Sequence, residues 1–214
     1  MDVVFDIGNV LLRWDPRFLF RKIFEDECRM EHFLSTACAN DWILETDTCA
    51  DFAAAVAARA NRHPEYAAEL RMFDERWLET LGGVIEQNVA VFGRLRAAGR
   101  PVYGLTNYSA QKFDMSRIIY PFLDEFDTVV VSGREGVAKP DARLFRILFE
   151  RIGRDPHELL FVDDSPRNVA ASEELGMAAI LYRPGVDLEQ ELERHGVWRQ
   201  GASQVAKRVS RRDA

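Results

Sequence analysis

Short apolar runs alternate with helical patterns over most of the chain. Five runs rich in β-forming residues predict strands: residues 3–5, 102–105, 128–131, 159–162 and 178–181. Between the later runs, apolar residues recur at three- and four-residue spacing, most clearly from residue 141 to 152, and predict helices. Continuous apolar strands that alternate with helices are typical of a parallel sheet covered on both faces. We therefore expect an α/β protein with a Rossmann-like parallel-sheet core.

Residues 15–83 have a different pattern, with apolar positions at helical spacing and no convincing strand. Asp15-Pro16 is typical of a helix start, and residues 48–51 resemble a capping box. Another helix is predicted from Pro64 to Leu81, ended by two glycines. The predicted organisation has three parts: an α/β core (1–14 and 86–200), an inserted helical cap (15–85) and a flexible basic tail (201–214).

Composition narrows the class of protein. With 47% hydrophobic and 29% charged residues, the 214-residue chain is typical of globular proteins. Its net charge of -7 argues against a nucleic-acid partner, and no apolar run is long enough to predict a membrane span. The N-terminus enters a strand without the pattern of a signal peptide, so we expect a cytoplasmic protein. Three cysteines without CxxC spacing favour neither a disulfide framework nor a zinc site. The sequence is compatible with a monomer or a homodimer.

Polar and charged residues stand at the ends of three predicted strands. Asp6 ends the first strand, residues 106–107 (Thr-Asn) the second, and residues 163–164 (Asp-Asp) the fourth, while Lys139 lies in a loop between the last two. Because the carboxyl ends of parallel strands share one edge, these groups can converge there. Carboxylates with a lysine and polar donors suit Mg²⁺ binding and phosphoryl transfer, with Asp6 as a possible nucleophile. Each feature alone is equally typical of a turn, a solvated lysine or acids at a helix start.

Taken together, these segments resemble the four motifs of the haloacid dehalogenase-like (HAD) hydrolase superfamily. The matching segments are VVFDIGNV (3–10), GLTN (104–107), VAKP with Lys139, and FVDDSPRN (161–168). The resemblance extends from residue 1 to about residue 185, and the inserted helices resemble the helical C1-type cap of that family. It implies a HAD core with a C1 cap and a hydrolase that acts on small phosphorylated molecules with Mg²⁺ as cofactor.

The resemblance also implies roles for individual residues. Asp6 would be the nucleophile. The implied Mg²⁺ ligands are Asp6, the backbone carbonyl of Gly8, and Asp164. The residues that would hold or neutralise the phosphate are Thr106, Asn107 and Lys139. Those that would orient the ligands are Asp163 and Asn168, although Asp163 and Asp164 could exchange roles.

Two cap segments could face the substrate, namely Trp14 and the predicted loop 45–48. For Trp14, packing in the core or at the hinge is the better interpretation.

Gly8 departs from the usual pattern of the family. Phosphatases of this superfamily commonly have a second aspartate two residues after the nucleophile, which protonates the leaving oxygen and then activates water. Losing general acid–base help typically costs about 10²–10⁴-fold in rate. The Asp-x-Gly-Asn variant resembles bacterial α-glucose-1-phosphate phosphatases, which suggests sugar phosphates as substrates.

Two alternatives stay open at this point. A 2-haloacid dehalogenase would resemble this chain in core and cap but would lack the metal-binding aspartate of the fourth motif. A regulatory or binding protein with little turnover is favoured by Gly8 and opposed by the intact Asp6, Thr106, Lys139 and Asp164.

Overall fold

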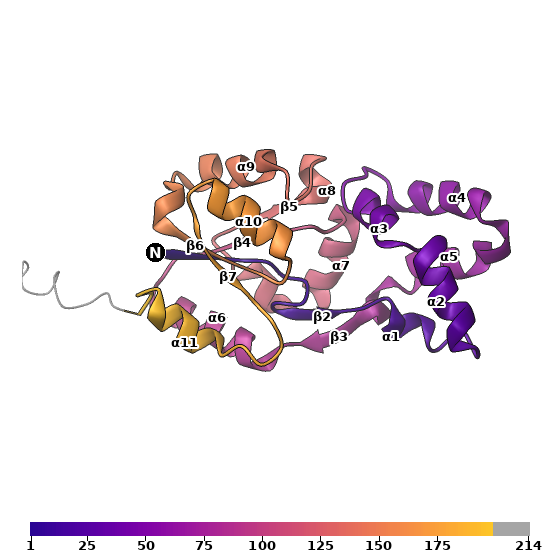
Figure 1. The fold of residues 1–214 in the computed structure, drawn as a ribbon, viewed down its shortest axis with the longest axis horizontal. Helices are drawn as coiled ribbons and strands as arrows, with labels where there is room; N and C mark the ends of the chain where they lie inside the picture. The colour runs from indigo at the N-terminus through magenta and orange to yellow at the C-terminus, as the bar shows by residue number, and fades with distance from the viewer. Residues whose placement is uncertain (199–214) are drawn as a thin grey trace, which may run out of the picture.

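A five-stranded parallel sheet forms the centre of the computed structural model, which describes residues 1–198 (Figure 1). The strand order is β5-β4-β1-β6-β7. The strands are β1 (Asp2–Phe5), β4 (Val102–Thr106), β5 (Thr128–Val131), β6 (Leu159–Asp163) and β7 (Ala178–Leu181). The predicted parallel-sheet α/β class is confirmed, and all five predicted strands are present.

The first strand lies in the middle of the sheet although it comes first in the sequence. Val4 lies between Tyr103 of β4 and Phe161 of β6 in the ladder. Val3, Val4 and Phe5 are buried because helices cover both faces of this strand. The central position of β1 brings the residues that follow it to the middle of the carboxyl edge.

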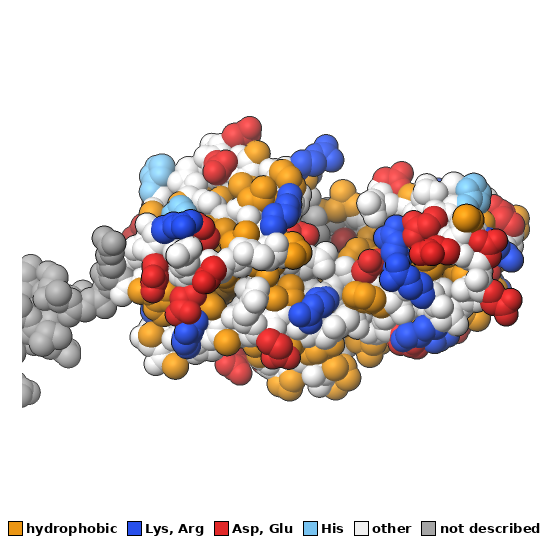
Figure 2. All heavy atoms as spheres, turned by 60° about the horizontal axis from the view of Figure 1, so that its bottom comes forward, with side chains coloured by type: hydrophobic (Ala, Val, Ile, Leu, Met, Phe, Trp, Pro, Cys, Tyr) orange, Lys and Arg blue, Asp and Glu red, His pale blue; other side chains and the backbone are white. Residues whose placement is uncertain are grey.

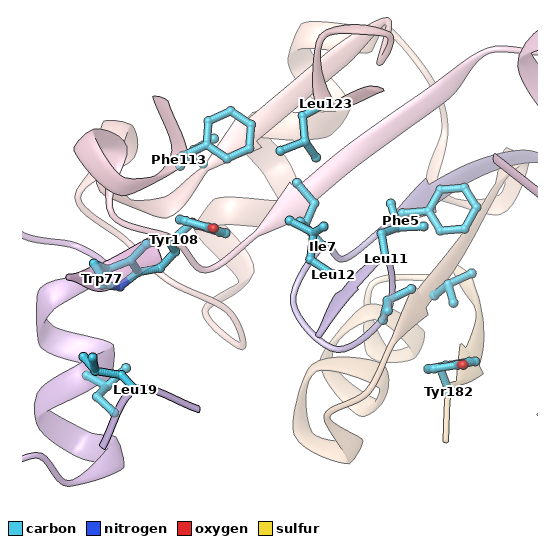
Figure 3. Close-up of a cluster of buried hydrophobic side chains, with 14 of the residues drawn as sticks. Phe5, Ile7, Leu11, Leu12, Leu19, Trp77, Tyr108, Phe113, Leu123 and Tyr182 are labelled. Atoms are coloured by element: carbon cyan, nitrogen blue, oxygen red, sulfur yellow. The ribbon is translucent and has the colours of Figure 1, made fainter. Parts of the chain in front are cut away.

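Helices cover the sheet in two layers (Figure 1). On one face lie α6 (Glu86–Ala97), α7 (Ala110–Ile119) and α11 (Leu188–Arg194), whose apolar side chains join the larger core cluster. On the other face, α9 (Ala142–Ile152) and α10 (Pro166–Glu174) pack against a second cluster. A single turn, α8 (Ser132–Glu135), follows β5. Figure 3 shows that the larger cluster continues from Phe5 in the sheet to Trp77 and Leu19 outside it.

A helical insert, residues 15–80, connects two short strands that follow β1. These strands, β2 (Leu12–Trp14) and β3 (Leu81–Val84), pair as an antiparallel ribbon. The helices between them are α1 (Arg17–Phe20), α2 (Glu27–Thr36), α3 (Asn40–Thr46), α4 (Phe52–Arg62) and α5 (Ala67–Glu75), with 3-10 turns η1 (Pro64–Tyr66) and η2 (Trp77–Thr80). Phe73 holds them together, because its ring lies 5.8–6.1 Å from those of Phe20, Trp42 and Phe52.

The expectation that residues 15–83 contain no strand was wrong. Residues 81–84 form β3, and the predicted helix from Pro64 to Leu81 is divided into η1, α5 and η2. Gly82 does not end a helix. A Cβ at Gly82 would lie 2.5 Å from the ring of Phe18, so glycine lets the ribbon pass close to this side chain.

The predicted capping box at residues 48–51 was also wrong. Asp51 is the N-cap of α4, and its carboxylate accepts a hydrogen bond from the amide of Ala54 at 3.0 Å. The Thr48 hydroxyl donates backward to the carbonyl of Glu45. Helix α3 was not predicted, and it places Glu45 and Thr46 in a helix rather than in a loop.

Two predictions are not tested by this architecture. The exact division into residues 1–14 and 86–200 as core and 15–85 as cap stays a prediction, and the basic tail at 201–214 lies outside the described residues. Within residues 1–198, no helix is long and apolar enough to cross a membrane.

Candidate active site

Asp6 lies directly after β1 at the carboxyl edge of the sheet. Its backbone amide donates to the carbonyl of Val162 at 2.8 Å, which fixes the chain between β1 and β6. Its carboxylate accepts from the amide of Ile7 at 2.7 Å and lies 3.0 Å from the ammonium nitrogen of Lys139. Burial raises the pKa of Asp6 well above its ordinary value, and the nearby carboxylates add to this rise, while Lys139 opposes it.

Lys139 is the buried cation of the site. Its ammonium group contacts the Leu105 carbonyl at 2.7 Å and Asp163 Oδ2 at 2.7 Å, besides Asp6. Burial alone would lower the pKa of Lys139, but the carboxylates of Asp163 and Asp6 raise it above its ordinary value. The Asn107 side chain accepts from the Lys139 amide at 2.8 Å and donates to its carbonyl at 3.0 Å. Asn107 thus fixes the loop that carries Lys139.

The two acids of the fourth motif have different surroundings. Asp163 is fully buried, and both its oxygens accept hydrogen bonds from protein donors: the Ser165 amide, the Asn168 side chain and Lys139. Asp164 is half-exposed and lines a cavity. Burial, followed by the charge of Asp163, raises its pKa. Asp163 is therefore arranged to orient its neighbours, and Asp164 to meet a ligand.

Asp6, Asp163 and Asp164 form a potential metal site. One carboxylate oxygen from each can be chosen so that all three lie within 4.8 Å of one another. We call these acids and Lys139 the charged cluster. The hydroxyl of Thr106 is buried beside this edge, and within residues 1–198 it has no hydrogen-bond partner. A buried unsatisfied hydroxyl costs about 1–3 kcal/mol, so such a group is typical of a site that binds something polar.

A cavity of about 400 Å³ lies between the charged cluster and the helical insert. Asp6, Lys139 and Asp164 are at one side, together with Gly8 and Asn107. The opposite side, which we call the apolar wall, consists of Trp14, Ile43, Leu44, Phe73, Trp77 and Leu81. Figure 2 shows the hollow between the core and the insert. The cavity thus pairs an ionic floor with an apolar side.

The cap residues expected near a substrate divide into two groups. Trp14, Thr46 and Asp47 line the cavity, whereas Glu45 and Thr48 do not. Trp14 is also partly buried against the core, so the packing interpretation describes part of its role.

Several lining residues were not predicted. Trp77 was interpreted as part of a helix core, although it begins the 3-10 turn η2 and its ring lies 5.2 Å from that of Tyr108 (Figure 3). Arg167 also lines the cavity, and its place in the fourth motif was the signal available in the sequence.

Gly8 leaves room at the cavity. A Cβ built there would meet no atom within 4 Å, so packing does not require glycine at this position. The next residue, Asn9, adopts a left-handed backbone conformation with φ of 53°, and its side chain accepts from the Trp14 amide. The turn after Asp6 is thereby tied to the ribbon.

Three hydrogen-bonded contacts hold the insert over the core. The Ser132 hydroxyl donates to the Asp47 carbonyl at 2.6 Å, and the Phe52 amide donates to the Gln111 side chain at 3.0 Å. The Lys112 ammonium donates to the carbonyl and carboxylate of Asp74 at 2.8 and 2.5 Å. Contacts from α7 and α8 of the core therefore hold the insert in place beside the cavity.

Comparison with known proteins identifies the family. Residues 3–176 match the family model of haloacid dehalogenase-like hydrolases. The chain belongs to this family. The HAD family enzyme BT-2542 of Bacteroides thetaiotaomicron has the same fold, with a TM-score of 0.70 at 22% identity, covering 89% of this chain and 97% of that one.

Two curated relatives differ in how much of them this HAD-like hydrolase covers. Sesquiterpene phosphatase astK of Aspergillus oryzae is 25% identical over 185 residues, which cover 83% of this chain and 87% of the relative. Bifunctional epoxide hydrolase 2 of Sus scrofa is 31% identical over 86 residues, or 40% of this chain. This match spans 16% of the length of the epoxide hydrolase.

Proposed function

We propose that this HAD-like hydrolase removes phosphate from small phosphate monoesters through an aspartyl-phosphate on Asp6. The observation that carries the proposal is the Asp6 carboxylate at the cavity floor, 3.0 Å from Lys139 and beside Asp164. Both contacts to this carboxylate, from the Ile7 amide and from Lys139, are made to Oδ1. Within the described residues Oδ2 has no such contact, so its lone pairs are available for attack.

The reaction would proceed in two displacements. Asp6 Oδ2 forms a bond to phosphorus while the bond from phosphorus to the alcohol oxygen breaks. A water oxygen then attacks phosphorus, the bond to Asp6 breaks, and inorganic phosphate leaves with the carboxylate restored. Lys139 offsets negative charge on Asp6 and on the phosphate in both steps, and Thr106 and Asn107 would donate to phosphate oxygens.

The residues at the floor fit Mg²⁺. Mg²⁺ prefers oxygen ligands and keeps positions for water and phosphate, and a cluster of carboxylates beside a cavity offers this arrangement. We propose Asp6, Asp164 and the Gly8 carbonyl as ligands, with Asp163 and Asn168 orienting them. When bound, Mg²⁺ would neutralise charge that develops on the phosphoryl oxygens. BT-2542, which shares the fold, has been crystallised with magnesium and inorganic phosphate.

The apolar wall bears on the substrate class. The Asp-x-Gly-Asn motif suggested sugar phosphates, but sugars are bound through many polar donors and acceptors. Trp14, Leu44 and Trp77 offer apolar surface instead. We therefore propose phosphate esters with an apolar organic group ahead of sugar phosphates, an order that the sesquiterpene phosphatase among the relatives supports.

The two alternatives fit the site less well. A metal-independent dehalogenase does not need a metal-binding carboxylate such as Asp164 at the floor of the cavity. A protein that only binds a ligand does not need the Asp6 carboxylate held beside Lys139. Chloride release from 2-chloropropionate in EDTA would favour the dehalogenase. Failure to bind beryllofluoride with Mg²⁺ would favour the binding protein.

A panel of phosphate esters tests the proposal. The panel contains farnesyl phosphate, phenyl phosphate and glucose 1-phosphate, each assayed with Mg²⁺ and with EDTA. We expect phosphate release with Mg²⁺, fastest for the apolar esters, and none from Asp6→Asn. Release no faster than from Asp6→Asn on every ester would refute the phosphatase function, and preference for glucose 1-phosphate would refute the substrate order.

A further inference from the structure

The first displacement needs a proton donor that Gly8 cannot supply. In an in-line displacement, the attacking and leaving oxygens lie on opposite sides of phosphorus. Because Asp6 attacks from the sheet edge, the leaving oxygen faces away from that edge, toward the helical insert. A donor for this oxygen must therefore come from the insert side of the cavity.

The insert contributes one carboxyl group to the lining of the cavity. Asp47 follows α3 and is, among the described residues that line the cavity, the only carboxylic acid contributed by the insert. Its backbone carbonyl accepts from the Ser132 hydroxyl at 2.6 Å, so the core fixes this point of the insert. Asp47 lines the same cavity as Asp6, Lys139 and Asp164.

The surroundings of Asp47 favour a carboxyl that holds a proton near neutral pH. Burial raises its pKa to about 7, while hydrogen bonding from the Ser109 backbone and the charge of Lys139 oppose this rise. Cys49 and Tyr108 are the other titratable groups on which Asp47 acts. A catalytic acid works best with a pKa close to the working pH.

The other titratable groups of the cavity are less suited to this task. Asp6, Lys139 and Asp164 belong to the charged cluster, on the side of the attacking oxygen. The Tyr108 hydroxyl lies 2.7 Å from the Ser116 hydroxyl, and burial raises its pKa. Arg167 is permanently charged and does not give up a proton at neutral pH.

We propose that Asp47 is the general acid and base of this hydrolase, in place of the side chain that Gly8 lacks; the proposal rests on the phosphatase function above. As the bond from phosphorus to the leaving oxygen breaks, the Asp47 carboxylic acid gives its proton to that oxygen, and the alcohol leaves. The Asp47 carboxylate then takes a proton from water while the water oxygen attacks phosphorus. The bond to Asp6 breaks, phosphate is released, and Asp47 is again protonated.

The decisive test compares two leaving groups in Asp47→Asn. Nitrophenolate leaves without a proton, whereas an alkoxide needs one, so loss of the acid slows only phosphorylation by the alkyl ester. In rapid-quench measurements we expect the rate of Asp6 phosphorylation by octyl phosphate to fall about 10²–10⁴-fold. The rate with p-nitrophenyl phosphate should change by less than about tenfold. Asp41→Asn, on the exposed start of the same helix, should leave both rates unchanged.

A second variant, Gly8→Asp, supplies a carboxylic acid from the sheet side of the cavity. Because a Cβ at Gly8 would meet no atom within 4 Å and the residue lines the cavity, Gly8→Asp should be accommodated. We expect the Gly8→Asp, Asp47→Asn double variant to recover part of the octyl phosphate rate. Equal slowing of both esters, or no slowing of either, would overturn the role of Asp47.

The wild-type chain provides a readout that needs no variant. Phosphorylation by octyl phosphate should fall above about pH 7 as Asp47 loses its proton, and phosphorylation by p-nitrophenyl phosphate should lack this decline. Identical pH profiles would overturn the role. If the wild type forms no phosphoenzyme with either ester, the proposed function itself fails. A phosphoenzyme with no leaving-group effect in Asp47→Asn refutes the role of Asp47 alone.

Discussion

The two sides of the cavity differ in how they accommodate charged groups. On the sheet side, buried charges are paired: Lys139 contacts two carboxylates, and Asp163 has donors on both oxygens. On the insert side, apolar side chains dominate, and the one carboxyl, Asp47, has no cation in hydrogen-bond contact among residues 1–198. At Asp6, the contact with Lys139 opposes the rise in pKa that burial causes, whereas at Asp47 no cation in hydrogen-bond contact does so among the described residues.

This difference indicates a division of labour between the two sides. In the proposed function, the sheet side would hold fixed charge against a phosphoryl group. The insert side would offer apolar surface to an organic group and, as proposed above, exchange a proton. Changes on the sheet side should therefore affect every substrate, and changes on the insert side should discriminate between substrates.

The largest effect is expected from Asp6→Asn. Without the nucleophile, hydrolysis of every ester should fall on the order of 10⁴-fold or more. The fold should persist, because the amide is nearly the same size and keeps an oxygen for the Ile7 amide. Steady-state rates with circular dichroism as a folding control measure this. Substantial turnover by Asp6→Asn would mean that the sheet side does not supply the nucleophile.

Two buried lysines, Lys139 at the cavity floor and Lys112 at the contact between α7 and the insert, should differ in their effect on stability. Lys139→Met leaves Asp6 and Asp163 without their cation, which should cost about 3–5 kcal/mol of unfolding free energy at pH 8. The loss should shrink at lower pH, where the Asp6 carboxyl takes up a proton. Lys112→Met on α7 should cost only about 1 kcal/mol, because its partner Asp74 is partly exposed to water. Urea denaturation of both variants tests this, and equal losses would contradict it.

Mg²⁺ should stabilise the sheet side in the absence of substrate. At a concentration of about 100 times its Kd, Mg²⁺ should raise the unfolding free energy by about 2.7 kcal/mol, because it binds the folded chain. EDTA should abolish the gain, and Asp164→Asn should reduce it strongly. Asp41→Asn is the matched control and should keep it. Thermal unfolding with and without Mg²⁺ measures the effect; a gain unchanged in Asp164→Asn would place the ion elsewhere.

On the insert side, Leu44→Asn should alter substrate preference. Leu44 lines the cavity and is 41% exposed, so its replacement does not open the core. Losing about 1 kcal/mol of apolar contact should raise KM for farnesyl phosphate about fivefold and leave methyl phosphate unaffected. Ile118→Asn, on the exposed face of α7, is the control. A similar change in KM for both esters would argue against the wall as a specificity surface.

The smallest effect concerns the stability of Asp47→Asn. A carboxyl whose pKa is about 7 in the folded chain and about 3.9 in the unfolded chain binds more protons when folded. The contribution of Asp47 to the free energy of unfolding is therefore fully present below about pH 4 and is lost as the pH rises through about 7. Asparagine does not ionise, so the variant should gain stability relative to the wild type as the pH rises from 4 to 8, with no gain at pH 4. Urea denaturation at both pH values tests this; no gain at pH 8 would show that Asp47 is not strained by its charge.

The sheet side was largely predictable from sequence, and the insert side was not. Apolar runs define the strands, and the carboxyl ends of parallel strands meet, so Asp6, Lys139 and Asp164 could be brought together without coordinates. The roles of Asp163 and Asp164 could not be separated, because contact with Lys139 depends on how β6 ends. Strand β3 was not predicted because the glycine at position 82 is explained by close packing against Phe18, which is distant in the sequence. Likewise, the position of Asp47 depends on α3 and on Ser132, which sequence spacing does not reveal.

The central claim is that Asp6 carries the phosphoryl group, and trapping that group tests it most directly. The chain is mixed with p-nitrophenyl phosphate and Mg²⁺, quenched in acid within milliseconds, digested and examined by mass spectrometry. We expect one phosphoryl group on the peptide that contains Asp6, absent from Asp6→Asn and lost when the quench follows substrate exhaustion. Nitrophenol release with no phosphoryl group on Asp6, or with the group on another residue, would contradict the account.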